Sequence, residues 1–128
     1  MDGLNIMGLT IAESQATLDA RFPTSAGTDY IAYSVNGTSE WANLARTAVG
    51  ATGWVAATAA DPSVKANGGI LTSGTVATAG GTVSHFAIFT ASTAGTQRTD
   101  WQTLTTARVL AVGDSLSWAV GACAITLT

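Results

Sequence analysis

The sequence predicts an all-β protein, a β-sandwich of the jelly-roll kind with one short N-terminal helix. Apolar and polar residues alternate through the last third of the chain, in residues 83–92 and again in residues 109–118. Glycine-rich turn signals separate such runs, at residues 36–37, 67–69 and 79–81. Short alternating runs between turns of this kind are typical of the strands of a sandwich.

One helix is expected, over residues 10–21. A Thr-x-x-Glu pattern starts at Thr10 and is typical of a capping box, which satisfies free N–H groups of the first helical turn. Apolar residues then recur along one helical face, at Ile11, Leu18 and Phe22. Pro23 disfavours helical conformation in the residue before it, so we expect the helix to end there.

After the helix, the period of the apolar residues becomes that of a strand. Strands are expected over residues 30–35 and 70–78, and a weaker one within residues 44–55. The last third is expected to hold three more strands, divided by a Gly-Thr turn and a Val-Gly-Asp turn and ending with residues 122–128. We therefore divide the chain into an N-terminal arm, residues 1–10, and a single β-sandwich domain, residues 11–128.

Charged residues are rare in this chain. They make up 10% of the sequence, against about 25% in an average globular domain. Soluble monomers usually keep a charged surface, so we expect much of this surface to lie against other subunits. The alternative is a β protein that stays soluble through its Ser and Thr hydroxyls.

Charge and hydropathy also argue against two classes of partner. The net charge is −3 and the five basic residues are scattered, so no basic stripe is available to bind nucleic acid. No apolar run approaches the roughly 18 residues of a membrane span, and the N-terminus lacks the features of a signal peptide. We expect neither a nucleic-acid nor a membrane partner, and folding in a cytoplasm. Cys123, the one cysteine, is interpreted as a small buried apolar residue.

The sequence offers no catalytic, cofactor-binding or metal-binding residues. His85 is the single histidine, and no Gly-x-Ser-x-Gly elbow accompanies it. One His and one Cys give no zinc spacing, and the glycine pairs lack the Gly-Lys-Ser/Thr ending of a phosphate-binding loop. We interpret His85 as a packed strand residue with hydrogen-bonded ring nitrogens, and the protein as a non-enzyme.

Two of the four tryptophans are candidates for an interface. Trp41 and Trp101 stand beside polar residues, and Trp is favoured at protein interfaces. A surface Trp that stacks on a sugar is the competing interpretation. Trp118 instead alternates with Leu116 and Val120, a pattern that predicts a core strand.

The N-terminal arm supplies the other interface candidates, namely Leu4, Ile6 and Leu9. Residues 1–10 contain few charges, and a segment this short cannot offset its own folding entropy in isolation. We expect these side chains to contact another subunit. The alternative is that the arm forms a strand of its own chain's sheet.

The segment Thr-Val-Ser-His-Phe-Ala-Ile-Phe-Thr-Ala-Ser-Thr-Ala-Gly-Thr at residues 82–96 resembles the C-terminal signature of a family of small tailed-phage virion structural proteins, often labelled tail-fibre-like. The resemblance extends over most of the chain, at residues 30–33, 44–49, 101, 104–105 and 112–116. The chain departs from the family at Ser34-Val35-Asn36-Gly37, where a His-Thr-Ala-Asp-Pro stretch is usual.

This resemblance implies a β-sandwich component of the virion without enzymatic activity. Together with the low charge, it favours a capsid decoration (cement) protein that binds the major capsid protein or neighbouring virion subunits. A homo-oligomer is expected, and a trimer is favoured. A tail or fibre-attachment subunit is the first alternative, and a carbohydrate-binding module is a more distant one.

Overall fold

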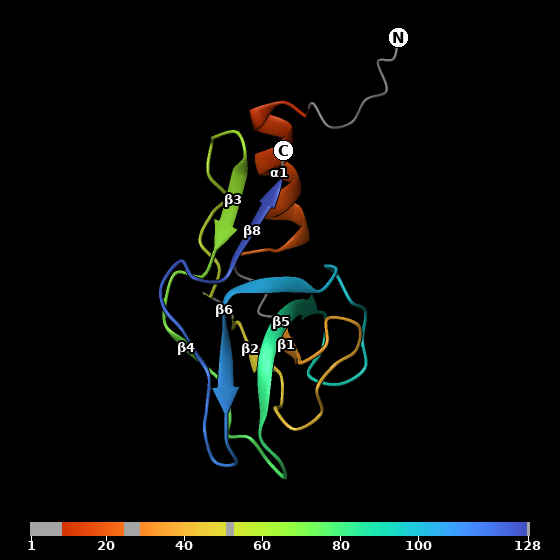
Figure 1. Cartoon of the computed structure of the whole chain (residues 1–128). Helices are drawn as coiled ribbons and strands as arrows, with labels where there is room; N and C mark the ends of the chain where they lie inside the picture. The colour runs from red at the N-terminus through yellow and green to blue at the C-terminus, as the bar shows by residue number, and fades with distance from the viewer. Residues whose placement is uncertain (1–8, 25–28, 51–52, 128) are drawn as a thin grey trace.

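The computed structural model describes residues 9–24, 29–50 and 53–127, whose arrangement is shown in Figure 1. They form a helix, α1 (Ile11–Arg21), followed by eight strands. In chain order the strands are β1 (Tyr30–Ser34), β2 (Thr47–Ala48), β3 (Ser63–Ala66), β4 (Leu71–Thr72), β5 (Gly81–Phe89), β6 (Gln102–Leu110), β7 (Ser117–Trp118) and β8 (Ala124–Leu127). The prediction of an all-β fold with one short helix is confirmed.

All strand pairs among the described residues are antiparallel. The largest sheet has the order β2-β1-β5-β6, and two ribbons, β3-β8 and β4-β7, stand beside it. Among the described residues no single second sheet faces the four-stranded one, so the finer prediction of a jelly roll is not confirmed. Figure 1 shows α1 beside the β3-β8 ribbon at one end of the molecule, with the four-stranded sheet at the other.

Helix α1 begins where its cap was predicted. The Thr10 hydroxyl accepts a hydrogen bond from the N–H of Glu13 at 3.2 Å, which satisfies one free donor of the first turn. Leu18 and Phe22 are buried as predicted. Ile11 is 46% exposed, so the prediction that it shares their apolar face is wrong. The helix rests on β3 and β8 through its later turns, and its first turn extends past them.

The core lies between the four-stranded sheet and the β4-β7 ribbon. Strands β1 and β5 place Tyr33 opposite Phe86 and Ile31 opposite Ile88, and all four side chains are buried. The Phe86 ring meets Trp118 of β7 edge to face, with centroids 5.0 Å apart. Aromatic pairs in this geometry add to the stabilisation from apolar burial. Strands and ribbon therefore share one hydrophobic cluster.

Several strands differ from those predicted. The weak strand within residues 44–55 is reduced to β2, and the strand expected over residues 70–78 is only β4. Strand β3 was missed, because residues 61–62 were interpreted only as a turn. The last predicted strand is divided into β7 and β8 by a turn at Gly121, whose φ is +78°. Glycine adopts that conformation without steric cost.

Asn67 explains this division. Its side-chain amide donates to the carbonyls of Gly69 at 2.8 Å and Ala119 at 2.9 Å, and its Oδ1 accepts from the N–H of Cys123 at 2.9 Å. Its backbone bonds to Cys123 and Gly121 as well. Because Asn67 is fully buried, these bonds hold the turn between β7 and β8 against the end of β3.

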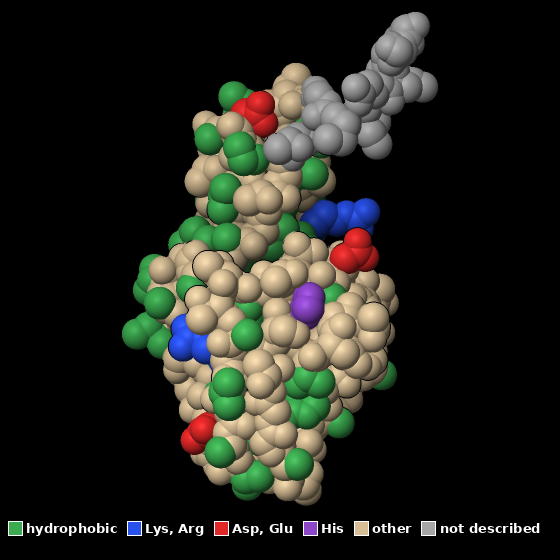
Figure 2. Space-filling model, viewed as in Figure 1, with side chains coloured by type: hydrophobic (Ala, Val, Ile, Leu, Met, Phe, Trp, Pro, Cys, Tyr) green, Lys and Arg blue, Asp and Glu red, His purple; other side chains and the backbone are tan. Residues whose placement is uncertain are grey.

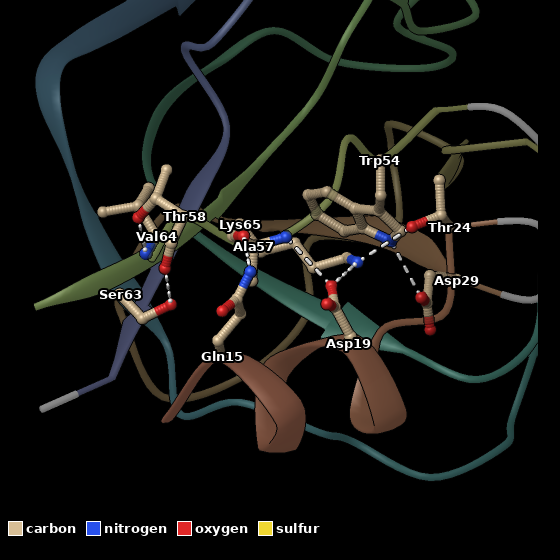
Figure 3. A network of polar contacts seen from close by, with 10 residues as sticks. All are labelled: Gln15, Asp19, Thr24, Asp29, Trp54, Ala57, Thr58, Ser63, Val64 and Lys65. Atoms are coloured by element: carbon tan, nitrogen blue, oxygen red, sulfur yellow. Dashed lines mark hydrogen bonds and ion pairs between the residues drawn. The ribbon is translucent and has the colours of Figure 1, made fainter. Parts of the chain in front are cut away.

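A buried lysine fixes α1 on β3, as Figure 3 shows. The Lys65 ammonium is fully buried and donates to Asp19 Oδ1 at 2.7 Å and to Thr24 Oγ1 at 3.1 Å. Asp19 also accepts from the N–H of Ala57. The hydrogen bond from Lys65 is the main reason that the pKa of Asp19 lies below its ordinary value of 3.8.

Asp29 is a second carboxylate in Figure 3, and its pKa is shifted in the opposite direction from that of Asp19. Asp29 is 2% exposed, and its Oδ2 accepts from the indole N–H of Trp54 at 2.8 Å. Within the described residues its Oδ1 makes no hydrogen bond, and it lies 3.4 Å from Nε of Arg98. Burial raises the pKa of Asp29 above 3.8, because the bond from Trp54 and the charge of Arg98 only partly offset desolvation.

Candidate interaction surface

Strand β6 lies at the edge of the four-stranded sheet. Within the described residues its one neighbour is β5, so its outer side is free of strand pairing. Every residue of β6 except Leu104 and Leu110 is exposed. An edge strand presents unpaired N–H and C=O groups, which are a template for pairing with another chain. β2 is the other edge strand of this sheet, but it has two residues whereas β6 has nine, so β6 offers the longer edge for association.

A large bulge bends β6 away from β5. Val83 pairs with Arg108 and His85 pairs with Thr103, so Ser84 alone faces residues 104–107. Bulges of this kind break the ladder and turn the strand. The bend is visible in Figure 1, where the first part of β6 runs across the view and the second part runs vertically down from its end.

The bend opens a cleft of about 450 Å³ between β6 and the segment that contains β7. Its apolar lining comes from Phe86, Leu104, Leu116 and Trp118, and most of the remaining lining is Thr, Ser and Ala. Arg108 is the one charged side chain of this lining. The cleft therefore suits an apolar segment that carries a carboxylate.

Exposed apolar side chains continue beyond the cleft. Val109 is 81% exposed at the end of β6, Val112 is 56% exposed in the following turn, and Ile70 is 72% exposed before β4. Val120 was predicted to be core but is 63% exposed, because β7 ends at Trp118 and the chain turns there. Figure 2 shows one face of the molecule with few charged side chains among many apolar and uncharged ones.

The two predicted interface tryptophans lie outside the cleft lining. Trp41 is half-buried against Gly81, where an added Cβ would come within 2.9 Å of the indole. Trp101 is half-buried beside Phe89, with ring centroids 6.1 Å apart. Part of each residue reaches the surface, and their role in an interface stays a prediction.

Arg46 holds the loops around Phe89 together. Its guanidinium lies 3.9 Å from the Phe89 ring centroid and makes a two-pronged pair with Glu40, at 2.9 Å and 2.8 Å. It also donates to the carbonyls of Ala91 and Ala94, both at 2.8 Å. The planar guanidinium thus joins both loops to each other and to Phe89.

The predicted arm is described only at its end. Leu9 is 37% exposed just before α1, as a contact residue for another subunit would be. Leu4 and Ile6 lie outside the described residues. The contacts predicted for all three stay predictions.

The cleft was not recognised in the sequence. Leu104 was not singled out as a contact residue, and Trp118 and Leu116 were interpreted as core alone. Both of those side chains are buried, and both also line the cleft. The alternation of Leu116 and Trp118 predicted correctly that both side chains are buried. It could not show that both also line an open cleft.

His85 has the contacts of a packed residue. Its Nδ1 lies 2.7 Å from the Ser84 hydroxyl, and its ring lies under Gly37, where an added Cβ would come within 2.9 Å. Among the described residues, no acidic side chain hydrogen-bonds to it, and no three His, Cys, Asp or Glu side chains gather as a metal site. The helix described here is too short to cross a membrane.

Comparison with known proteins gives a family for this chain. Residues 12–126 match the model of a family described as podophage GP4 fiber I protein gp80. No curated protein matches the sequence significantly. The matched region contains the cleft and nearly all of the helix and strands, and it confirms the resemblance to tailed-phage virion structural proteins. The chain belongs to the podophage GP4 fiber I protein family, a family of phage virion structural proteins.

Proposed function

We propose that this chain is a structural subunit of a phage tail fibre, or of the attachment of a fibre to the virion, and that it catalyses no reaction. The observation that carries this proposal is the match of residues 12–126 to a fibre protein family. Capsid decoration was the first expectation from the sequence and fibre attachment the alternative. The family supports the alternative better, and no observation favours a cement protein in particular.

The surface of the chain supports a role in assembly. Low charge lowers the cost of removing a surface from water, because few ions must be desolvated. The edge strand β6 adds free backbone groups, and the cleft adds apolar area beside them. Both features are typical of surfaces that bind another protein chain.

The partners proposed are neighbouring virion subunits, copies of this chain among them. Closed symmetric rings are the usual form of homo-oligomers, and we favour a trimer. The major capsid protein would be the partner if the chain decorated the shell. We also propose that the chain assembles in the host cytoplasm.

Location on the virion tests this function. An epitope tag inserted between Ala59 and Ala60, in an exposed turn before β3, marks the chain without touching β6 or the cleft. Gold-labelled antibody on purified tagged virions is expected at the tail. Virions without the tag are the control for non-specific labelling.

Two other labelling results would overturn the proposal. Signal spread evenly over the shell would favour capsid decoration. Absence of the chain from virions, together with glycan binding by the purified protein, would favour the carbohydrate-binding module. In that case Trp101, whose ring lies partly at the surface, would be the first residue to replace.

A further inference from the structure

We propose that the cleft between β6 and β7 receives residues 2–8 of a neighbouring copy, which pair with the free edge of β6 as an added strand. This inference rests on the proposed self-association and names the surfaces that carry it. It assigns the N-terminal arm as the donor and the cleft as the acceptor. The association is therefore head-to-tail, because donor and acceptor are different surfaces.

The acceptor is suited to an extended peptide. An added strand takes its affinity from backbone hydrogen bonds to a sheet edge and its specificity from pockets for alternate side chains. The outer side of β6 is free of strand pairing within the described residues, and the cleft beside it is lined by Phe86, Leu104, Leu116 and Trp118. Its volume of about 450 Å³ lies within the range of about 300–1,000 Å³ typical of ligand sites.

The sequence of the arm complements this lining. In an extended strand alternate residues share a face, so Asp2, Leu4 and Ile6 would lie in one row. An antiparallel register that places Asp2 opposite Arg108 also places Ile6 opposite Leu104. The row of the arm holds one carboxylate and two apolar side chains, and the cleft holds one guanidinium and an apolar lining. In this one register the carboxylate of the arm lies opposite the guanidinium of the cleft, and an apolar side chain of the arm lies opposite an apolar residue of the cleft.

The length of the chain favours a neighbour over the arm's own cleft. Figure 1 shows β6 beyond the C-terminal end of α1. Residues 2–8 precede the N-terminal end of this helix in the sequence. The helix has 11 residues and is about 16 Å long. The chain from Ile6 to Thr10 spans at most about 14 Å when extended. To place Ile6 in its own cleft, the arm would have to run back along the whole helix. The extended chain from Ile6 to Thr10 is shorter than the helix, so it cannot reach.

Engineered disulfides test the pairing. In the proposed register Leu4 lies opposite Thr106, so full-length chains carrying Leu4→Cys and differently tagged chains carrying Thr106→Cys are mixed under mild oxidation. A cross-linked heterodimer is expected on a non-reducing gel. Ala60→Cys replaces Thr106→Cys as the matched control, because Ala60 is exposed and does not line the cleft. Native Cys123 is fully buried and does not compete.

Second variants separate the possible outcomes. One acceptor chain combines Thr106→Cys with Leu4→Ser and Ile6→Ser, so its own arm is impaired while its cleft is intact. The Leu4→Cys donor should still form a cross-link with this acceptor, because only the acceptor's cleft takes part in the pairing. Adding Leu104→Asp to the acceptor should abolish that band. Equal cross-linking at positions 60 and 106 would overturn the proposal. So would an intrachain disulfide in a monomeric chain that carries both Leu4→Cys and Thr106→Cys. Full-length chains that oligomerise without this cross-link would overturn the strand addition and leave the fibre assignment intact.

Discussion

The indole N–H of Trp118 donates a hydrogen bond to the hydroxyl of Tyr33, with 3.1 Å between the nitrogen and the oxygen. Both side chains are buried, and the same hydroxyl is hydrogen-bonded to Thr47. The bond joins β7 to β1, and so fixes the ribbon that forms one wall of the cleft to the four-stranded sheet. Burial raises the pKa of Tyr33, so the hydroxyl stays protonated.

Tyr33→Phe is expected to lower the free energy of unfolding by about 1–3 kcal/mol, because it leaves the buried N–H of Trp118 without an acceptor. Urea denaturation followed by tryptophan fluorescence measures the change. Tyr30→Phe is the matched control, since Tyr30 is only half-buried, and should change stability by less than about 0.5 kcal/mol. Equal effects of the two variants would show that the bond between the layers adds nothing.

Arg46→Lys keeps the positive charge but removes the planar fork. The Arg46 side chain is 5% exposed and bonds Glu40, two backbone carbonyls and the face of Phe89. A lysine ammonium cannot make these contacts together, so we expect a loss of about 1–3 kcal/mol in thermal or chemical unfolding. Arg21→Lys, at an exposed position, should be close to neutral. A neutral Arg46→Lys would contradict the role of this side chain in joining the two loops.

Asp19 and Asp29 should influence stability with opposite dependence on pH. The pKa of Asp19 is lowered, so the folded state favours the carboxylate, and its stabilisation is present above 3.8 and lost as pH falls through the folded value. The pKa of Asp29 is raised, so the folded state binds the proton more tightly than the unfolded state. Its contribution then makes stability fall as pH rises from 3.8 through the folded value.

Asp19→Asn should therefore destabilise the protein at pH 7, with a difference from the wild type that shrinks below pH 3.8. Asp29→Asn should stabilise it at pH 7, because an amide can still accept from Trp54 and is cheaper to bury than a carboxylate. That gain should disappear at low pH. Unfolding measured from pH 3 to 8 gives both curves. A destabilising Asp29→Asn at neutral pH would mean that the pairing with Arg98 outweighs desolvation.

The Cys123 thiol should be inert in the folded protein. It is fully buried, and burial raises its pKa to about 12, so almost no thiolate is present near neutral pH. Reaction with a thiol reagent at pH 8 is expected to proceed at the rate of unfolding and to speed up with denaturant. Fully denatured protein, which exposes the same thiol, is the control. Fast labelling in native buffer would show that the turn between β7 and β8, held by Asn67, opens locally.

Local features were predictable from the sequence. Thr10 caps α1 because the capping bond spans three residues, and β1 begins at Tyr30, where the strand was predicted to begin. The turn at Gly113, whose φ is +91°, was also recognised from its residue type. Such features depend on near neighbours in the chain, and a single sequence contains that information.

Long-range features were not predictable. Asn67 was interpreted as a turn residue, yet its partners Ala119 and Cys123 lie more than fifty positions away. The cleft depends on the bulge that leaves Ser84 facing residues 104–107, which only the register of β5 and β6 reveals. Leu104 looks like an ordinary strand residue until that register is known. The candidate surface is therefore a property of strand pairing rather than of any motif.

The mass of the purified protein in solution tests the central claim, that this chain acts by association, most directly. Native mass spectrometry over a concentration series is expected to give multiples of the 12.9 kDa protomer, with the trimer prominent. Dilution should return the monomer, because mass action governs an assembly of separate chains. A species that stays at 12.9 kDa at every concentration would contradict the account.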